Sequence, residues 1–80
     1  MRIGRLPNSE SDWARARKLA TRISRERTRQ GLTQDELAAA ARHSVDMVRA
    51  LERPRSANPG VFVIADIASA LGVTVEQLTK

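Results

Sequence analysis

The chain has 80 residues, with 14 Lys and Arg, 9 Asp and Glu, and a net charge of +5 at pH 7. This length suits one small domain, whose thin core favours a compact bundle of short helices. Cysteine is absent, which excludes disulfides and thiolate metal sites. No apolar stretch approaches the roughly 20 residues of a membrane span, and no secretory signal is recognisable, so we expect a cytoplasmic protein.

The positive charge is concentrated in the first third of the sequence. Residues 1–29 carry nine basic and three acidic residues, a net +6, whereas residues 30–80 carry five and six, a net −1. This distribution points to a polyanionic partner. Trp13 and Phe62 are the only aromatic residues, which argues against single-stranded DNA or RNA, because their binders usually stack bases on several aromatic rings.

Residues 1–10 lack periodicity and are expected to form a flexible arm before a domain that spans residues 11–80. Ser11 or Asp12 can cap a first helix, and Gly31 is placed to end it in a left-handed conformation. Apolar residues at spacings of three and four predict the buried face of this helix. They are Trp13, Ala16, Leu19, Ala20 and Ile23.

Two short helices are expected next. Thr33 and Glu36 form a capping box that begins the second helix, which continues through a run of alanines. Ser44 can cap a third helix that runs from Val45 to about Arg53. Residues 33–53 are therefore predicted to form a helix-turn-helix, whose second helix fits the major groove of DNA.

The last quarter of the sequence predicts two more helices. Pro54 stops the third helix, a polar loop follows, and Pro59 suits the first turn of a fourth helix that Gly72 closes. Thr74 and Gln77 repeat the capping-box pattern before a short fifth helix. The apolar stripe expected on the fourth helix comprises Val61, Ile64, Ala65, Ala68 and Leu71. The fold class is therefore all-α.

A wider set of residues, spread over most of the chain, has a characteristic order and spacing. It comprises Leu19, Ile23, Arg27, Gly31-Leu32-Thr33-Gln34, Leu37-Ala38, Ser44, Val48, Leu51-Glu52-Arg53, Asn58-Pro59, Ile67-Ala68, Leu71-Gly72-Val73 and Leu78. With this set, residues 19–78 resemble the Cro/C1-type (XRE-like) family of helix-turn-helix transcriptional regulators. The resemblance implies a lambda-repressor-like five-helix bundle that binds double-stranded operator DNA, usually as a dimer and often as a repressor.

The resemblance also assigns roles to individual residues. The positions that face the groove, where base contacts are expected, are Ser44, Val45, Asp46, Arg49 and Ala50. The positions where phosphate contacts are expected are Gln34, Arg42, His43, Arg53 and Arg55. Arg27 and Glu52 match a structural ion pair that clamps the first helix to the third. The fork of Arg49 suits guanine, while Asp46 can either accept from cytosine or orient a neighbouring arginine.

Four residues depart from the family pattern. Arg42 stands at the turn where glycine is common, and a positive φ there costs a non-glycine residue roughly 1 kcal/mol. His43 and Glu26 replace apolar residues, and Pro54 replaces a glycine before a loop that is one residue longer. We interpret His43 as a turn residue and expect Glu26 to be solvated.

Several alternatives stay open from the sequence. Val73, Val75 and Leu78 can form a dimer seam or seal the core of the monomer. The protein can be an antitoxin that represses its own operon and binds a toxin, or an adaptor that binds another regulator and no DNA. An enzyme is not expected, because one histidine, no cysteine and no glycine-rich phosphate loop offer little chemistry. No cofactor, metal, membrane or small-molecule substrate is expected.

Overall fold

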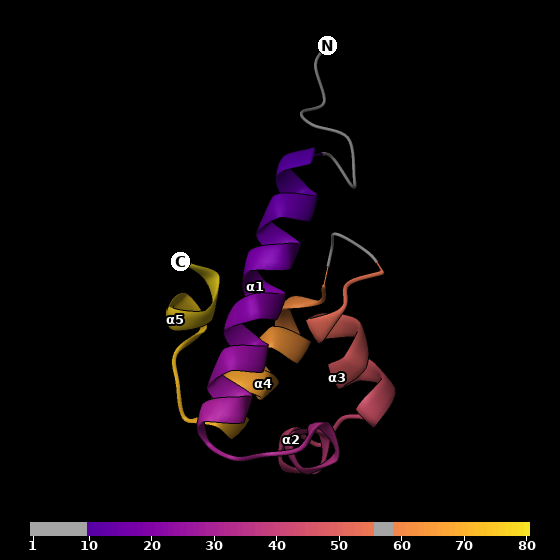
Figure 1. Ribbon diagram of the computed structural model, residues 1–80, viewed down its shortest axis with the longest axis vertical. Coiled ribbons are helices and arrows are strands. Elements are labelled where there is room, and N and C mark those ends of the chain that lie inside the picture. Colours follow the sequence, from indigo (N-terminus) through magenta and orange to yellow (C-terminus); the bar gives the residue numbers. More distant parts are fainter. Residues whose placement is uncertain (1–9, 56–58) are drawn as a thin grey trace.

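Five helices pack around a small apolar core in a computed structural model that describes residues 10–55 and 59–80 (Figure 1). In chain order they are α1 (Glu10–Arg29), α2 (Gln34–Ala41), α3 (Val45–Glu52), α4 (Val61–Leu71) and α5 (Val75–Thr79). The predicted all-α, five-helix architecture is confirmed.

The first helix starts earlier than the sequence suggested. α1 already includes Glu10, so Ser11 and Asp12 lie in its first turn and are not its caps. The predicted arm lies, apart from Glu10, outside the described residues. The end of α1 agrees with the prediction, since Gly31 has a φ of 75° and the amide of Leu32 donates to the carbonyl of Arg27. Four of the five predicted apolar positions are buried, and Trp13 is half-buried.

Side-chain caps and a left-handed turn residue define the helix-turn-helix. The Thr33 hydroxyl accepts from the Glu36 amide at 3.0 Å, and the Glu36 carboxylate accepts from the Thr33 amide at 2.8 Å, which completes the predicted capping box. Arg42 ends α2 with a φ of 61°, so the turn keeps the left-handed geometry that glycine would favour. Ser44 caps α3 by accepting from the Met47 amide, and α3 ends one residue before the predicted Arg53.

The fourth helix differs from its prediction at its start. Gly60 is its N-cap, so Pro59 precedes the helix and does not form its first turn. The face that α4 buries is also rotated: Val61 and Ala65 are exposed, and Ile67 joins the core in their place. Gly72 closes α4 with a φ of 72°, as expected. The core residues of the whole bundle are Leu19, Ile23, Leu37, Ala38, Ala41, Val48, Leu51, Ile64, Ile67, Ala68, Leu71 and Leu78.

α1 is the longest helix, and the others are arranged around it. It packs against α3 on one side and α5 on the opposite side, while α2 bridges α3 and α4 (Figure 1). The side chain of Gln30 donates to the carbonyl of Leu71 at 2.7 Å, and Arg22 donates to the carbonyl of Gln77 at 3.2 Å. Within residues 10–55 and 59–80, no helix has the length and apolar character needed to cross a membrane. Because α3 and α5 pack on opposite sides of α1, the molecule has two separate flanks, one beside α3 and one beside α5.

Candidate nucleic-acid interface

α3 presents one face to the core and another to solvent. Val48 and Leu51 are buried against the other helices. Asp46, Arg49 and Ala50 lie on the opposite side at spacings of three and four, and the exposed Arg53 directly follows the helix at the next step of the same stripe. An exposed helix face of this kind is what the major groove accepts.

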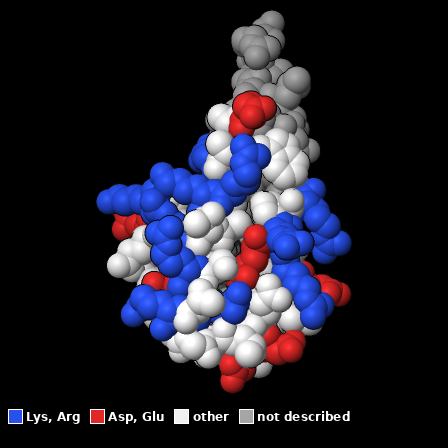
Figure 2. Space-filling model, viewed as in Figure 1, with Lys and Arg blue, Asp and Glu red and all other residues white. Residues whose placement is uncertain are grey.

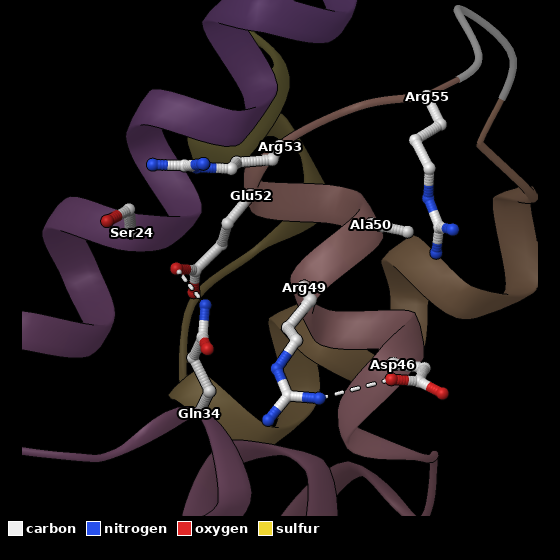
Figure 3. A pocket seen from close by; sticks show the side chains of 8 residues that line it. All are labelled: Ser24, Gln34, Asp46, Arg49, Ala50, Glu52, Arg53 and Arg55. Carbon is white, nitrogen blue, oxygen red and sulfur yellow. Dashed lines mark hydrogen bonds and ion pairs between the residues drawn. The ribbon is translucent and has the colours of Figure 1, made fainter.

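A hollow of about 720 Å³ lies along this stripe (Figure 3). Its walls come from three helices and from the segment after α3, so residues far apart in the sequence meet there. The residues that line it are Ser24, Gln34, Asp46, Arg49, Ala50, Glu52, Arg53 and Arg55. Seven of the eight had been assigned roles from the sequence, so the folded chain brings most of the predicted site together.

A two-point ion pair fixes the base of the hollow. Arg27 on α1 donates from Nε and Nη2 to the two carboxylate oxygens of Glu52 on α3, at 2.7 and 3.0 Å. A third guanidinium nitrogen of Arg27 donates to the carbonyl of Leu32 at 2.8 Å. The hydrogen bonds with Glu52 raise the pKa of Arg27 above its already high ordinary value. The predicted Arg27–Glu52 pair is therefore present, and it joins α1, the following turn and α3.

Glu52 also positions the first residue of α2. Gln34 donates from Nε2 to a Glu52 carboxylate oxygen at 3.0 Å, as the dashed line in Figure 3 shows. The amide nitrogen of Gln34 has a second proton, which stays free for another acceptor. Gln34 therefore lines the hollow in a defined orientation, with one N–H donor available at the N-terminus of α2.

Three arginines and two carboxylates line the hollow, so its net charge is positive. Arg49 donates to Asp46 at 3.1 Å, but both side chains are exposed, at 57% and 80%, so this pair is weak and easily opened. Arg53 and Arg55 have no described carboxylate within 4 Å. Arg53 extends toward α1, whereas Arg55 extends past Ala50 on the other side of the hollow (Figure 3). Two guanidiniums that pair with no carboxylate of the described residues therefore flank the exposed face of α3.

Other predicted contact residues lie elsewhere. The hydroxyl of Ser44 accepts from the helix amide of Met47, and Val45 is half-buried against the core. His43 points to α4, where its Nε2 lies 2.8 Å from an Asp66 carboxylate oxygen. Arg42 is exposed at the turn, outside the residues that line the hollow. Roles for these four residues remain predictions.

Ser24 is the lining residue that sequence reasoning missed. It lies on α1, three residues before Arg27, and therefore on nearly the same side of that helix. Because the resemblance had placed Arg27 against α3, this spacing alone could have placed Ser24 beside the hollow.

Comparison with known proteins agrees with this geometry. The family model HTH_3, described as helix-turn-helix, matches residues 23–78. The chain belongs to this helix-turn-helix family, of the Cro/C1 (XRE-like) type, and is thereby a regulator of the DNA-binding helix-turn-helix class. The expected family resemblance is confirmed over most of its length. No match to the chain is found among curated proteins.

Several solved structures have the same fold. A hypothetical transcription factor, NHTF, from Neisseria is 30% identical with a TM-score of 0.78, over 99% of this chain and 87% of that one. The restriction-modification controller protein C.AhdI from Aeromonas hydrophila is 29% identical with a TM-score of 0.77, over 82% and 98%. The N-terminal DNA-binding domain of SinR from Bacillus subtilis is 25% identical with a TM-score of 0.75, over 80% and 93%.

Proposed function

We propose that the protein regulates transcription by binding a specific double-stranded DNA sequence, with α3 inserted in the major groove. The observation that carries this proposal is the exposed stripe of α3, flanked by Arg53 and Arg55, whose guanidiniums have no carboxylate partner among the described residues. Phosphates on either side of the groove would meet these two arginines, while the stripe between them would face base edges.

Individual residues take distinct parts in this proposal. Arg49 leaves Asp46 and donates to O6 and N7 of a guanine, the contact that its fork fits best. Gln34, held by Glu52, donates its free amide proton to a phosphate. Asp46 either accepts from a cytosine amino group or steers Arg49, the two alternatives that the sequence also left open. The short α3 offers few other hydrogen bonds to bases, so DNA shape would supply part of the specificity.

The decisive experiment is duplex binding as a function of salt. Binding through several phosphate contacts weakens linearly on a log–log plot, and the loss of one contact reduces the slope by about 1. We expect Arg53→Ala and Arg55→Ala each to give such a reduction on any duplex. Arg49→Ala should instead relax the preference, at one base pair, among sequences selected from a random pool.

The matched control is Lys80→Ala, which removes one charge at the end of the α5 flank. This variant should bind with an unchanged slope and unchanged sequence preference. Absence of duplex binding even at low salt would contradict the proposal and favour an adaptor.

We further propose that the protein acts as a dimer on a near-palindromic operator with half-sites about one helical turn apart. One helix as short as α3 contacts few bases, so two copies would be needed for useful specificity. Of the three residues that the sequence left open as a dimer seam or a core seal, Leu78 is buried and Val73 packs against the monomer core. Val61 and Phe62 at the start of α4 are far more exposed, at 67% and 82%, and are the better candidates for the seam.

A further inference from the structure

Five basic residues of α1 form one continuous stripe. They are Arg15, Lys18, Arg22, Arg25 and Arg29, and their spacings of three, four, three and four repeat the helical period. The stripe spans about 21 Å along the helix axis. Arg22 is half-buried and the other four are exposed. The two remaining basic residues of α1, Arg17 and Arg27, lie off this stripe.

The stripe borders α5, on the opposite side of α1 from α3. Arg22 fixes this placement, since it donates to the carbonyl of Gln77 on α5. Figure 2 shows basic side chains in two groups, one on the α5 side of the molecule and one on the α3 side. A duplex held against α3 would therefore leave the stripe uncovered. Three of its members, Arg15, Lys18 and Arg22, also precede the residues that the family model matches.

A hollow of about 280 Å³ adjoins the middle of the stripe. The residues that line it are Arg22, Arg25, Glu26, Val73, Gln77 and Leu78. Its apolar part is the half-buried Val73, because Leu78 is only 2% exposed, and its other lining residues are polar or charged. The negative charge of Glu26 is already paired with Arg29 there, and the hydrogen bonds from Arg29 and Gln30 lower the pKa of its carboxyl below the ordinary 4.5. The hollow thus combines apolar contact with cations.

Most of the stripe lacks compensation within the fold. Arg29 pairs with Glu26, but Arg15, Lys18 and Arg25 have no described carboxylate within 4 Å. Like charges three or four residues apart on a helix repel one another and destabilise it. An anionic partner bound along α1 would offset this repulsion, because its negative charges would attract the basic side chains of the stripe.

We propose that the stripe binds an acidic α-helix of a partner protein, with one apolar side chain of that helix seated against Val73. Carboxylates that recur every three or four residues on a helix would match the cations in period, and arginine forms two-point hydrogen bonds with carboxylates. This apolar contact favours a protein partner, because the outer surface of a duplex is dominated by charged phosphates and has no protruding apolar side chain to place there. This interaction is independent of duplex binding at α3.

The test uses a fluorescent synthetic helix about three heptads long, with Glu at spacings of three and four and one central Leu. Its affinity is measured by anisotropy at about 0.1 M salt, where charges more than about 10 Å apart are screened. The control peptide has Gln at every Glu. The stripe variant is Arg15→Gln/Lys18→Gln/Arg25→Gln, which spares the two arginines that are bonded within the fold. The charge-matched variant is Arg17→Gln/Arg53→Gln/Arg55→Gln on the opposite flank.

We expect the acidic peptide to bind the wild type, and the stripe variant to lose about tenfold or more in peptide affinity while duplex affinity changes less than about twofold. The charge-matched variant should lose duplex affinity and keep the peptide. Thermal unfolding should find the stripe variant at least as stable as the wild type, because repulsion is removed. Equal binding of the Gln peptide, or equal binding by both variants, would overturn the proposal. Loss of duplex binding alone in the stripe variant would overturn it in favour of DNA.

Discussion

Glu52 is the residue on which the candidate interface is built. It accepts from Arg27 at both carboxylate oxygens and from Gln34, and its side chain is only 5% exposed. Its partners belong to α1 and α2, so one carboxylate holds three helices in register. Such a pair adds little net stability compared with an apolar core, but removing one partner leaves the other buried and uncompensated.

We therefore expect Glu52→Gln to lower the free energy of unfolding by about 3 kcal/mol, measured by urea denaturation followed by circular dichroism. Glu76→Gln, on an exposed face of α5, is the control and should change it by less than about 0.5 kcal/mol. At temperatures where Glu52→Gln stays folded, sequence preference on DNA should be retained, because Glu52 acts through the residues it holds. A variant as stable as wild type would show that the pair is dispensable.

The turn between α2 and α3 has a backbone conformation that its residue, Arg42, disfavours. Arg42 occupies the left-handed region, with a φ of 61°, and its amide and that of His43 donate to the last turn of α2. These bonds complete the end of α2 at the cost of an unfavourable backbone for arginine. A charged residue in a place that suits glycine is consistent with the predicted phosphate contact from Arg42.

Arg42→Gly separates the two effects at this turn. We expect the variant to gain up to about 1 kcal/mol in the free energy of unfolding, because glycine adopts this φ without strain. The same variant should bind duplex DNA less tightly, with a salt slope lower by about 1. Unfolding and anisotropy titrations measure the two quantities on one sample. Unchanged duplex affinity would remove Arg42 from the interface.

Gly72 provides the reverse control for the turn. It ends α4 with a φ of 72°, and a Cβ at this position would meet no atom within 4 Å beyond the adjacent backbone. Gly72→Ala should therefore lose about 1 kcal/mol from backbone strain alone, without a change in duplex binding. If neither Arg42→Gly nor Gly72→Ala alters the free energy of unfolding, backbone strain at a positive φ does not affect stability at these two helix ends.

What the sequence could predict depends on how local the cause is. The caps at Thr33, Ser44 and Thr74 were all predictable, because each depends on residues within three positions. The buried face of α4 was not, because packing against neighbouring helices decides which way a helix is rotated. The periodicity of α4 fits two adjacent faces, and packing selected the one with Ile67 instead of Val61.

The site divides in the same way. The stripe of Asp46, Arg49 and Ala50 follows from the period of α3, and the resemblance supplied the distant pair of Arg27 and Glu52. The family pattern could not show that His43 contacts Asp66, because that contact joins the turn after α2 to α4 through residues that are 23 positions apart. It also could not show that Val45 turns toward the core, which depends on how α3 is tilted.

At the scale of the whole molecule, the exposed pair at the start of α4 supports the proposed dimer. α4 follows α3 through one short connection, so a second copy packed on Val61 and Phe62 would bring two α3 helices near one another. This placement is what adjacent half-sites on one face of a duplex require. An aromatic residue exposed at 82% is also costly to leave in water, which favours burial against another chain.

Phe62→Ser should therefore weaken self-association by about tenfold or more, since a buried aromatic anchor at an interface is commonly worth at least 2 kcal/mol. Sedimentation equilibrium at micromolar concentrations, with and without a palindromic duplex, measures the effect directly. Val75→Ser, at an exposed apolar position on α5, tests the alternative seam that the sequence left open and should leave association unchanged. Because Phe62 contributes nothing to the core, the monomer should remain folded. If Val75→Ser disrupts the dimer and Phe62→Ser does not, the two copies meet through α5; if the wild type stays monomeric on the duplex, each copy reads its site alone.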